Sequence, residues 1–255
     1  MNGPRLSALV VARNEAAQLA DCLACLAFAE EIVVVLDRTT DGSRAIAEAA
    51  GARVLQGAWE LEGLRRNAGI AFCTGDWLLE VDADERVPPD LAAEVRRTIA
   101  TAAPGHFLLP FDNYVGNRLV RHGWGASWGV NAAPRLFSRG AKVWGEQRVH
   151  PRVSLQGSPR RLRGRMAHYV DRSLSDMLHR LDRYSTARAR DLRDSGQLGS
   201  LAGNLRRCVS RFLKCYVARK GYREGLMGFA IALFAGLYPL LSYLKARLDP
   251  DLPCD

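Results

Sequence analysis

Two acidic residues, Asp82 and Asp84, stand two positions apart directly after an apolar stretch, residues 76–81, that is typical of a buried strand. Carboxylates at this spacing can both reach one cation through the exposed turn that follows the strand. A hard divalent cation takes oxygen ligands and bridges diphosphates in many phosphate sites. It would also offset charge that develops on a leaving group. Many solvated turns carry the same acidic pair, so the surrounding elements must decide between these interpretations.

More polar residues follow two earlier apolar stretches, residues 6–12 and 31–36. They are Arg13, Asn14 and Glu15 after the first stretch, and Asp37, Arg38 and Asp41 after the second. In open α/β sheets, ligands bind beyond the carboxyl ends of the strands, where these residues would lie. The chain has neither a Gly-x-Gly-x-x-Gly after the first stretch nor a Gly-x-x-x-x-Gly-Lys anywhere. We therefore expect a ligand held by carboxylates, arginine and a metal.

Predicted strands and helices alternate four times in the first 100 residues. The strands are residues 6–12, 31–36, 53–55 and 76–81, and the helices are residues 15–28, 41–50, 61–73 and 88–100. This alternation predicts a doubly wound, mostly parallel α/β sheet. The composition is that of a globular chain, with 48% hydrophobic and 25% charged residues among 255. It excludes a disordered chain and a small disulfide scaffold.

The pattern changes after Pro104. Three predicted strands, residues 106–115, 133–138 and 162–170, extend the sheet with antiparallel members. Helices are then predicted over residues 173–196, 200–218 and 224–247, with Ser173 and Asp176 as a capping box and Gly196 as a stop. We expect a catalytic domain over residues 1–170 and a helical C-terminal region over residues 171–255.

Four motifs within residues 6–100 together resemble the nucleotide-sugar half of a family 2 glycosyltransferase with a GT-A fold. They are Ala12-Arg13-Asn14-Glu15, Asp37-Arg38-Thr39-Thr40-Asp41, Arg66-Asn67-Ala68-Gly69, and Thr74-Gly75-Asp76-Trp77 leading to Asp82-Ala83-Asp84-Glu85. The second half is similar to the bacterial subgroup that builds lipopolysaccharide core. The pieces that carry this similarity are Arg135-Leu136-Phe137, Val149-His150, Arg183-Tyr184-Ser185 and Gly221-Tyr222-Arg223-Glu224-Gly225.

The resemblance implies transfer of a sugar from a nucleoside diphosphate donor, with UDP the expected nucleotide, and inversion at the anomeric carbon. It implies that Asp37 and Arg66 hold the base, that Asp82 reaches the ribose or the metal, and that Asp84 ligates Mg²⁺ or Mn²⁺. Asp37 and Asp41 are four positions apart, whereas the family commonly has five. Either the loop is shorter here, or Leu36 occupies the position of the usual acid.

An inverting transfer needs a general base that takes the proton of the acceptor hydroxyl. Carboxylates are few in the second part of the predicted sheet, and we expect Glu146 to be the base, with Asp112 as the alternative. A surface glutamate paired with Arg148 is the competing interpretation of Glu146. His150 is a third metal ligand, a donor to the diphosphate or a structural histidine.

The net charge of +9 is confined to one stretch. Residues 148–224 hold 19 basic and 6 acidic residues, a net of +13. Residues 1–147 hold 15 and 18, a net of −3, and residues 225–255 hold 2 and 3, a net of −1. Such a stretch is suited to an anionic membrane surface or an anionic glycolipid acceptor.

An uncharged segment, residues 225–244, follows the basic stretch. Its 20 positions just reach the length of a membrane span, but its three glycines and Pro239 favour a helix that packs on the protein or lies in the membrane surface. The N-terminus lacks the features of a signal peptide. We expect a cytoplasmic protein, and the resemblance to lipopolysaccharide core enzymes implies that it is peripheral at the inner face of the bacterial inner membrane and acts on a lipid-linked saccharide.

Two other classes remain as alternatives. The net charge favours a nucleic-acid-binding protein, but the basic stretch has few aromatic residues and no groove-reading module, so we expect no nucleic-acid partner. A nucleotidyltransferase acting on sugar phosphates would share the sheet and the acidic site. It normally needs a glycine-rich, lysine-containing loop after the first strand, where this chain has Ala12-Arg13-Asn14-Glu15.

Overall fold

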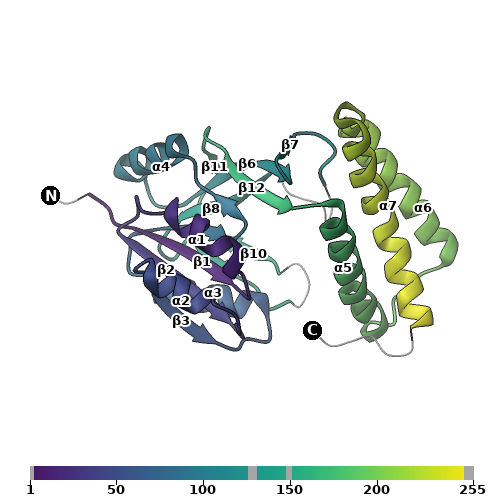
Figure 1. Ribbon diagram of the computed structural model, residues 1–255, viewed down its shortest axis with the longest axis horizontal. Coiled ribbons are helices and arrows are strands. Elements are labelled where there is room, and N and C mark those ends of the chain that lie inside the picture. Colours follow the sequence, from purple (N-terminus) through teal and green to yellow (C-terminus); the bar gives the residue numbers. More distant parts are fainter. Residues whose placement is uncertain (1–2, 126–130, 148–150, 250–255) are drawn as a thin grey trace. The chain divides into compact units, whose positions relative to one another are not determined.

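The computed structural model describes residues 3–125, 131–147 and 151–249, and it divides into two compact units (Figure 1). Unit 1 comprises Met1–Phe111 and Ala132–His168. Unit 2 comprises Asp112–Asn131 and Tyr169–Asp255. His150 lies outside the described residues.

Unit 1 is built on four parallel strands. They are β1 (Leu6–Ala12), β2 (Glu31–Asp37), β3 (Arg53–Gly57) and β4 (Trp77–Asp82), in the spatial order β3-β2-β1-β4. β1 is the central strand, with Val10 opposite Val34 of β2 and Val81 of β4. β1 is buried along its whole length because helices cover both faces of the sheet, which explains its continuous apolar sequence.

Four helices alternate with these strands. They are α1 (Ala16–Ala24), α2 (Ser43–Ala49), α3 (Glu62–Phe72) and α4 (Pro89–Thr101). Alternate residues of β1 point to opposite faces: Val10 joins the core with α1 and α4, whereas Leu9 joins the core with α3. The sheet is therefore doubly wound, as the sequence predicted. Cys22 of α1 is fully buried, and burial raises the pKa of its thiol, as expected for a small buried hydrophobe.

Antiparallel strands extend the sheet beyond β4. They are β8 (Ala132–Ser138), β6 (His106–Val115), β12 (Met166–Asp171) and β5 (Glu85–Arg86), in that spatial order. β8 is antiparallel to both β4 and β6, as expected, and β11 (Arg160–Arg161) pairs with β6 in parallel. A separate hairpin joins β9 (Lys142–Trp144) to β10 (Val153–Leu155). The α/β fold class predicted from the sequence is confirmed.

Several boundaries differ from the predicted ones. The first helix ends at Ala24 rather than at residue 28, and the last strand begins at Met166 rather than at residue 162. The sequence pattern did not predict five strands of two or three residues each, namely β5, β7, β9, β10 and β11. Such strands are too short for an apolar alternation to show.

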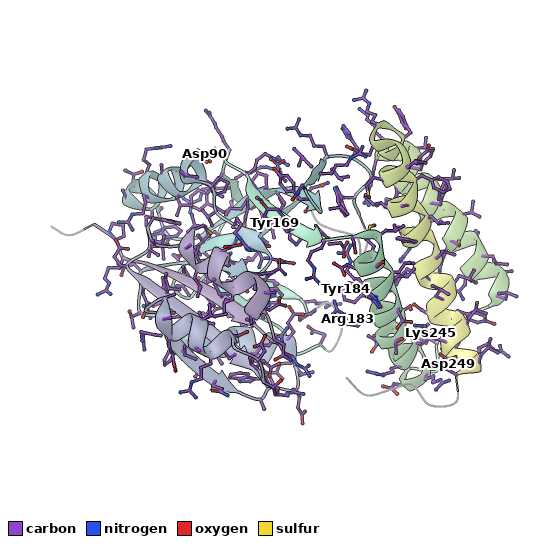
Figure 2. All side chains as sticks on the ribbon, in the orientation of Figure 1. Asp90, Tyr169, Arg183, Tyr184, Lys245 and Asp249 are labelled. Atoms are coloured by element: carbon purple, nitrogen blue, oxygen red, sulfur yellow. The ribbon has the colours of Figure 1, made fainter. Side chains whose placement is uncertain are left out.

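Unit 2 contains three long helices that pack together (Figure 1). They are α5 (Leu174–Asp194), α6 (Leu201–Leu213) and α7 (Gly225–Leu248). The side chain of Ser173 accepts a hydrogen bond from the backbone N–H of Asp176 (3.1 Å), which confirms this predicted cap. Lys245, near the end of α7, donates to the Asp182 carboxylate of α5 (2.6 Å; Lys245 is labelled in Figure 2). β7 (Arg118–Val120) pairs with the unit 2 part of β6.

The segment Gly221–Gly225 forms the corner before α7, after a short irregular helix, η1 (Lys214–Ala218). A Cβ atom on Gly228 would lie 1.9 Å from the carbonyl oxygen of Gly221, so only glycine allows the first turn of α7 to approach this corner. The carboxylate of Glu224 accepts hydrogen bonds from the backbone N–H groups of Arg121 (2.9 Å) and His122 (3.0 Å). The corner sequence thus has a structural role in unit 2.

Candidate active site

The acidic pair lies in the turn between β4 and β5, at the carboxyl end of β4. Ala83 is buried, whereas the side chains of Asp82 and Asp84 are 28% and 33% exposed. The backbone N–H of Asp82 donates to the Glu85 carboxylate (2.9 Å), which closes the turn. Both carboxylates of the pair therefore remain partly accessible at the strand end.

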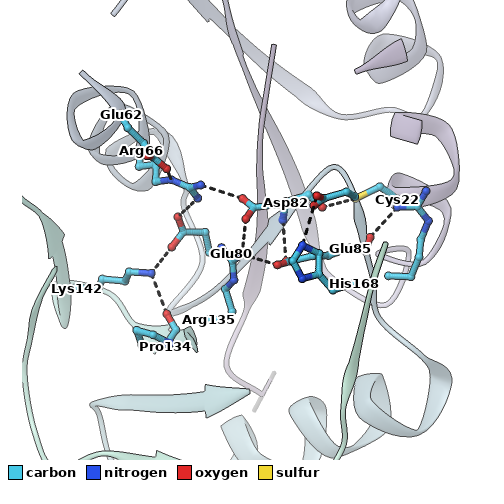
Figure 3. A network of polar contacts seen from close by, with 12 residues as sticks. Cys22, Glu62, Arg66, Glu80, Asp82, Glu85, Pro134, Arg135, Lys142 and His168 are labelled. Atoms are coloured by element: carbon cyan, nitrogen blue, oxygen red, sulfur yellow. Dashed lines mark hydrogen bonds and ion pairs between the residues drawn. The ribbon is translucent and has the colours of Figure 1, made fainter. Parts of the chain in front are cut away.

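Two arginines hold Asp82 (Figure 3). Arg66 of α3 donates to one oxygen of Asp82 (3.0 Å), and Arg135 of β8 donates to the other. Burial favours a higher pKa for Asp82, but the charges of Arg135 and Arg66 outweigh it and hold the pKa well below its usual range. Asp82 is therefore ionised, and both of its oxygens already accept hydrogen bonds.

A further carboxylate, Glu80, lies inside the sheet two residues earlier. It is fully buried and accepts hydrogen bonds from Arg66 (2.6 Å) and from Lys142 of β9. Burial would raise the pKa of Glu80, yet the neighbouring cations, first Lys142 and then Arg66, lower it to about 2. Glu80 thus compensates cations that would otherwise be buried without a partner charge.

The carboxylate of Glu85 is almost completely buried and accepts a hydrogen bond from Arg135. Its burial outweighs the Arg135 charge and, with repulsion from Asp82, raises the pKa of Glu85 to about 7. Three carboxylates and three cations thus form one network (Glu80, Asp82, Glu85, Arg66, Arg135 and Lys142), which positions the turn that carries Asp84.

Asp84 lies beside a histidine. One carboxylate oxygen of Asp84 is 3.4 Å from Nε2 of His168, and His168 pairs directly with Glu85 in the β12–β5 register. Ligand atoms of Asp84, Glu85 and His168 all lie within 4.8 Å of one another. Burial would lower the pKa of His168, but the hydrogen bond and charge of Asp84, together with the charge of Glu85, raise it.

This donor set fits a divalent cation. Two carboxylates and an imidazole supply the oxygen and nitrogen ligands that such ions take in proteins. The oxygens of Glu85 are occupied by Arg135 and by the Asp82 backbone, so Asp84 and His168 are the best placed to ligate directly. The side chains of Asp84 and His168 are 33% and 15% exposed, which leaves the site open to a ligand.

Helix α3 fixes the segment that carries Glu146. The side chain of Asn67 donates to the Trp144 carbonyl (2.8 Å) and accepts from the Trp144 backbone N–H (2.9 Å). A Cβ atom on Gly63 would lie 1.9 Å from the carbonyl oxygen of Gly145, so α3 and this segment are in direct contact. Glu146 follows immediately and is exposed.

The loops after β1 and β2 are joined to each other. Asn14, in a left-handed conformation (φ 57°), accepts a hydrogen bond from the Thr40 backbone N–H (2.8 Å). Asp41 accepts from the Ala16 backbone N–H (2.9 Å), and the Glu15 backbone N–H donates to Ser43 (3.0 Å). These contacts give Asn14, Glu15 and Asp41 a role in shaping the loops.

Asp37 and Arg13 differ in exposure. Asp37 is 3% exposed and accepts hydrogen bonds from the Trp59 backbone N–H (3.0 Å) and from Arg65 (3.2 Å). Arg13 is exposed. Of the site residues predicted from the sequence, the structure brings Arg66 into contact with Asp82, and Asn14 into the loop pair with Asp41.

Sequence reasoning assigned no role to Glu80, Glu85, Arg135, Lys142 or His168. One signal was available, because Glu80, Asp82 and Asp84 alternate and an acid within an apolar strand needs a partner charge. His168 is recognisable only from its pairing with Glu85.

A family model described as "Glycosyl transferase family 2" matches residues 7–135, just over half of the chain. The chain belongs to glycosyl transferase family 2. The family predicted from the four motifs is thus confirmed, and the chain is a glycosyltransferase. The match covers β1 through Arg135 and therefore includes the acidic turn and both arginines that hold Asp82.

Curated relatives extend the similarity over nearly the whole glycosyltransferase. A lipopolysaccharide core biosynthesis glycosyltransferase, LpsC, from Rhizobium meliloti (strain 1021) is 26% identical over 254 residues, which cover 94% of this chain and 91% of the relative. An uncharacterized glycosyltransferase from Rickettsia felis is 23% identical over 263 residues, covering 95% and 89%. The resemblance to lipopolysaccharide core enzymes is thus confirmed as a similarity.

Among solved structures, glucosyl-3-phosphoglycerate synthase from Mycobacterium tuberculosis, in complex with Mn²⁺, UDP and glucosyl-3-phosphoglycerate, is similar to this glycosyltransferase. The similarity covers 44% of this chain and 45% of that one, with 21% identity and a TM-score of 0.38.

Proposed function

We propose that this glycosyltransferase moves a sugar from a nucleoside diphosphate donor, with UDP as the expected nucleotide, to a lipid-linked saccharide such as lipopolysaccharide core, with inversion. The observation that carries the proposal is the convergence of Asp84, Glu85 and His168 at the carboxyl end of β4 in a family 2 chain. Ligands of open α/β sheets bind at such strand ends.

Asp84 and His168 are proposed to ligate Mg²⁺ or Mn²⁺ directly. Glu85 lies next to them, but its oxygens already accept hydrogen bonds from Arg135 and from the Asp82 backbone. A bound divalent cation would neutralise charge on the diphosphate leaving group. The sequence predicted Asp82 in the metal site or at the ribose. Here Asp82 is proposed to support the metal site by holding the turn in place. Its ion pairs with Arg66 and Arg135 fix the backbone from which Asp84 extends.

The remaining donor contacts are proposed for the loops at the carboxyl ends of β1 and β2. Arg13, Asn14 and Glu15 lie in the first loop, and Asp37 and Asp41 lie at the second. Asp37 and Arg66 are buried and already make ion pairs. They would therefore bind the nucleotide while keeping these ion pairs.

Glu146 is proposed as the general base. In the transfer, the acceptor hydroxyl oxygen attacks the anomeric carbon, the bond from that carbon to the diphosphate oxygen breaks, and the hydroxyl proton passes to a base. Glu146 is exposed, and Asn67 and Gly63 fix the backbone beside it, so its carboxylate is available to a substrate.

The acceptor class is supported by the similarity to LpsC over most of both chains. We infer a lipid-linked saccharide as the acceptor, which would place the enzyme at the inner face of the bacterial inner membrane.

Thermal unfolding tests donor binding. UDP together with Mn²⁺ should raise the Tm. UDP alone, or Mn²⁺ in the presence of a chelator, should raise the Tm less. A panel of UDP-, GDP- and ADP-linked sugars, with membrane extract as acceptor and nucleotide release as the readout, then identifies the donor. No shift with any nucleoside diphosphate and metal would overturn the proposal.

Substitution tests the base. Glu146→Gln should leave the UDP–Mn²⁺ shift unchanged and lower transfer by roughly 10²-fold, because an amide cannot accept the proton. Glu60→Gln, at another exposed glutamate of unit 1, is the matched control and should retain full transfer. A small effect at Glu146 would direct the search to Asp112 or His150.

A further inference from the structure

Helix α6 exposes an apolar stripe. Leu201, Leu205, Val209, Leu213 and Val217 stand four residues apart along α6 and η1, and each is between 45% and 59% exposed. Residues four apart lie on neighbouring positions of one helical face. A surface helix normally turns polar residues outward, so this stripe needs a partner.

Helix α7 carries further exposed apolar side chains, and one of them, Phe229, contacts α6. Leu226, Phe229 and Leu233 are exposed, and Leu226 is the most exposed of all, at 88%. The ring of Phe229 lies 5.7 Å from that of Phe212, next to Leu213 in sequence, and 6.1 Å from that of Tyr216, next to Val217. We call these eight residues the α6–α7 face (Leu201, Leu205, Val209, Leu213, Val217, Leu226, Phe229 and Leu233).

Much of the remainder of α7 packs inside unit 2. Among the described residues, one helix, Gly221–Leu248, is long and apolar enough to cross a membrane, and half of its most apolar window is buried. Its buried residues include Ile231, Phe234 and Tyr238, which belong to the core of unit 2. The apolar character of α7 is thus largely explained by packing against α5 and α6, whereas the stripe on α6 is not.

Basic side chains accompany the stripe. The segment from Leu201 to Glu224 holds seven basic residues and one acidic residue, Glu224, which is buried against backbone N–H groups. Arg206 and Lys214 are exposed, and each directly follows a residue of the stripe. Since one residue turns a helix by about 100°, each cation lies on the flank beside the apolar row.

We propose that the α6–α7 face docks on a lipid bilayer that carries anionic headgroups. The apolar row can enter the boundary between headgroups and acyl chains while the flanking cations contact lipid phosphates. A second copy of this chain fits less well, because two such faces would bring the flanking cations Arg206 and Lys214 of each copy together. The proposal rests on the proposed function for its purpose, access to a lipid-linked acceptor, but the docking is measurable without transfer.

Vesicle binding by the full chain tests the docking. Wild-type protein should co-sediment with vesicles of phosphatidylglycerol and phosphatidylethanolamine far better than with phosphatidylcholine vesicles. Val209→Ser with Leu213→Ser should weaken binding by about 10-fold or more, because two apolar side chains no longer enter the bilayer. The matched control is Leu174→Ser with Leu178→Ser, two leucines of α5 that are also four residues apart and about half exposed. This control should bind within twofold of the wild type.

A charge variant separates the two contributions. Arg206→Gln with Lys214→Gln should weaken binding to anionic vesicles by about 20-fold at low salt, and the difference from the wild type should shrink as salt is raised. Arg97→Gln with Arg163→Gln, two exposed arginines of unit 1, is the charge-matched control and should bind as the wild type does.

Three results would overturn the docking. These are no binding of wild-type protein to anionic vesicles, equal losses in the apolar variant and its control, or a dimer in size-exclusion chromatography that the apolar variant converts to a monomer without any vesicle binding. The UDP–Mn²⁺ shift, measured on every variant, reports the donor site separately. Vesicle binding without a UDP–Mn²⁺ shift would refute the proposed function alone, and a UDP–Mn²⁺ shift without vesicle binding would refute the docking alone.

Discussion

The charges around the acidic turn of unit 1 pair with one another, whereas Arg206 and Lys214 of unit 2 face solvent. Around the acidic turn, carboxylates such as Glu80 and Asp82 pair with buried cations such as Arg66 and Lys142. Arg206 of α6 and Lys214 of η1 are exposed and make no ion pair within the part of the chain that the structure describes. In unit 1, paired charges thus position a turn. In unit 2, exposed cations form an accessible basic surface.

The difference explains why net charge misleads as a guide to function in this chain. Buried pairs contribute little to net charge but strongly constrain geometry, since breaking one leaves an uncompensated charge. Exposed cations dominate the net charge of +9 but contribute little to folding.

The largest effect is expected at Asp84. Asp84→Ala should abolish metal-dependent binding of UDP and lower transfer by about 10³- to 10⁴-fold, because the cation loses a partly exposed carboxylate that pairs with no arginine among the described residues. The Mn²⁺-dependent thermal shift and the release of nucleotide measure the two losses. Asp90→Ala, at an exposed aspartate of α4, is the control and should change neither (Figure 2). Retained turnover in Asp84→Ala would remove Asp84 from the site.

The next effect concerns folding. Glu80→Gln should lower the free energy of unfolding by about 3–5 kcal/mol, because Lys142, which is 3% exposed, loses its carboxylate partner. Denaturant unfolding measures the change. Glu62→Gln removes a partner of the same Arg66 but at a side chain that is 36% exposed, and it should cost less than about 1 kcal/mol. Equal effects would mean that burial does not distinguish these ion pairs.

Local patterns in the sequence were enough to predict much of the fold and the position of the acidic turn. The apolar run of β1 and the helical spacing of α1 depend on neighbouring residues, so the doubly wound sheet could be predicted. Asp82 and Asp84 were located in the same way, because they directly follow the apolar run that forms β4.

The partners of these residues could not be predicted from local patterns. Arg66 and Arg135 are 16 and 53 residues from Asp82, and only tertiary packing brings them together. His168 comes beside Asp84 through a strand of two residues, β5, that leaves no detectable periodicity. A helix was predicted over residues 200–218, but the exposure of its apolar stripe depends on which faces α5 and α7 cover.

A pH titration extends the test of unit 1 beyond the acidic turn. Glu31 is buried, and although burial favours a higher pKa, hydrogen bonds from Ser7 and Thr74 and the ion pair with Arg53 lower it to about 2. Because this pKa lies below that of the unfolded chain, Glu31 stabilises the fold fully above about pH 4.5, and this contribution is lost as the pH falls towards 2. The free energy of unfolding of the wild type minus that of Glu31→Gln should therefore fall by roughly 3 kcal/mol over this interval. A difference that does not depend on pH would contradict the internal pairing.

The smallest effect is expected on the exposed side of the comparison. Arg206→Gln with Lys214→Gln should change the free energy of unfolding by less than about 0.5 kcal/mol, because neither cation has a carboxylate partner to lose within the described residues. A slight stabilisation is expected at low salt, since the surrounding segment holds seven basic residues and one acidic residue, and it should disappear at high salt. Denaturant unfolding at both salt concentrations measures this. A loss of more than about 1.5 kcal/mol would show that these cations hold unit 2 together, and the contrast between the two units would then fail, since charge would be structural in both.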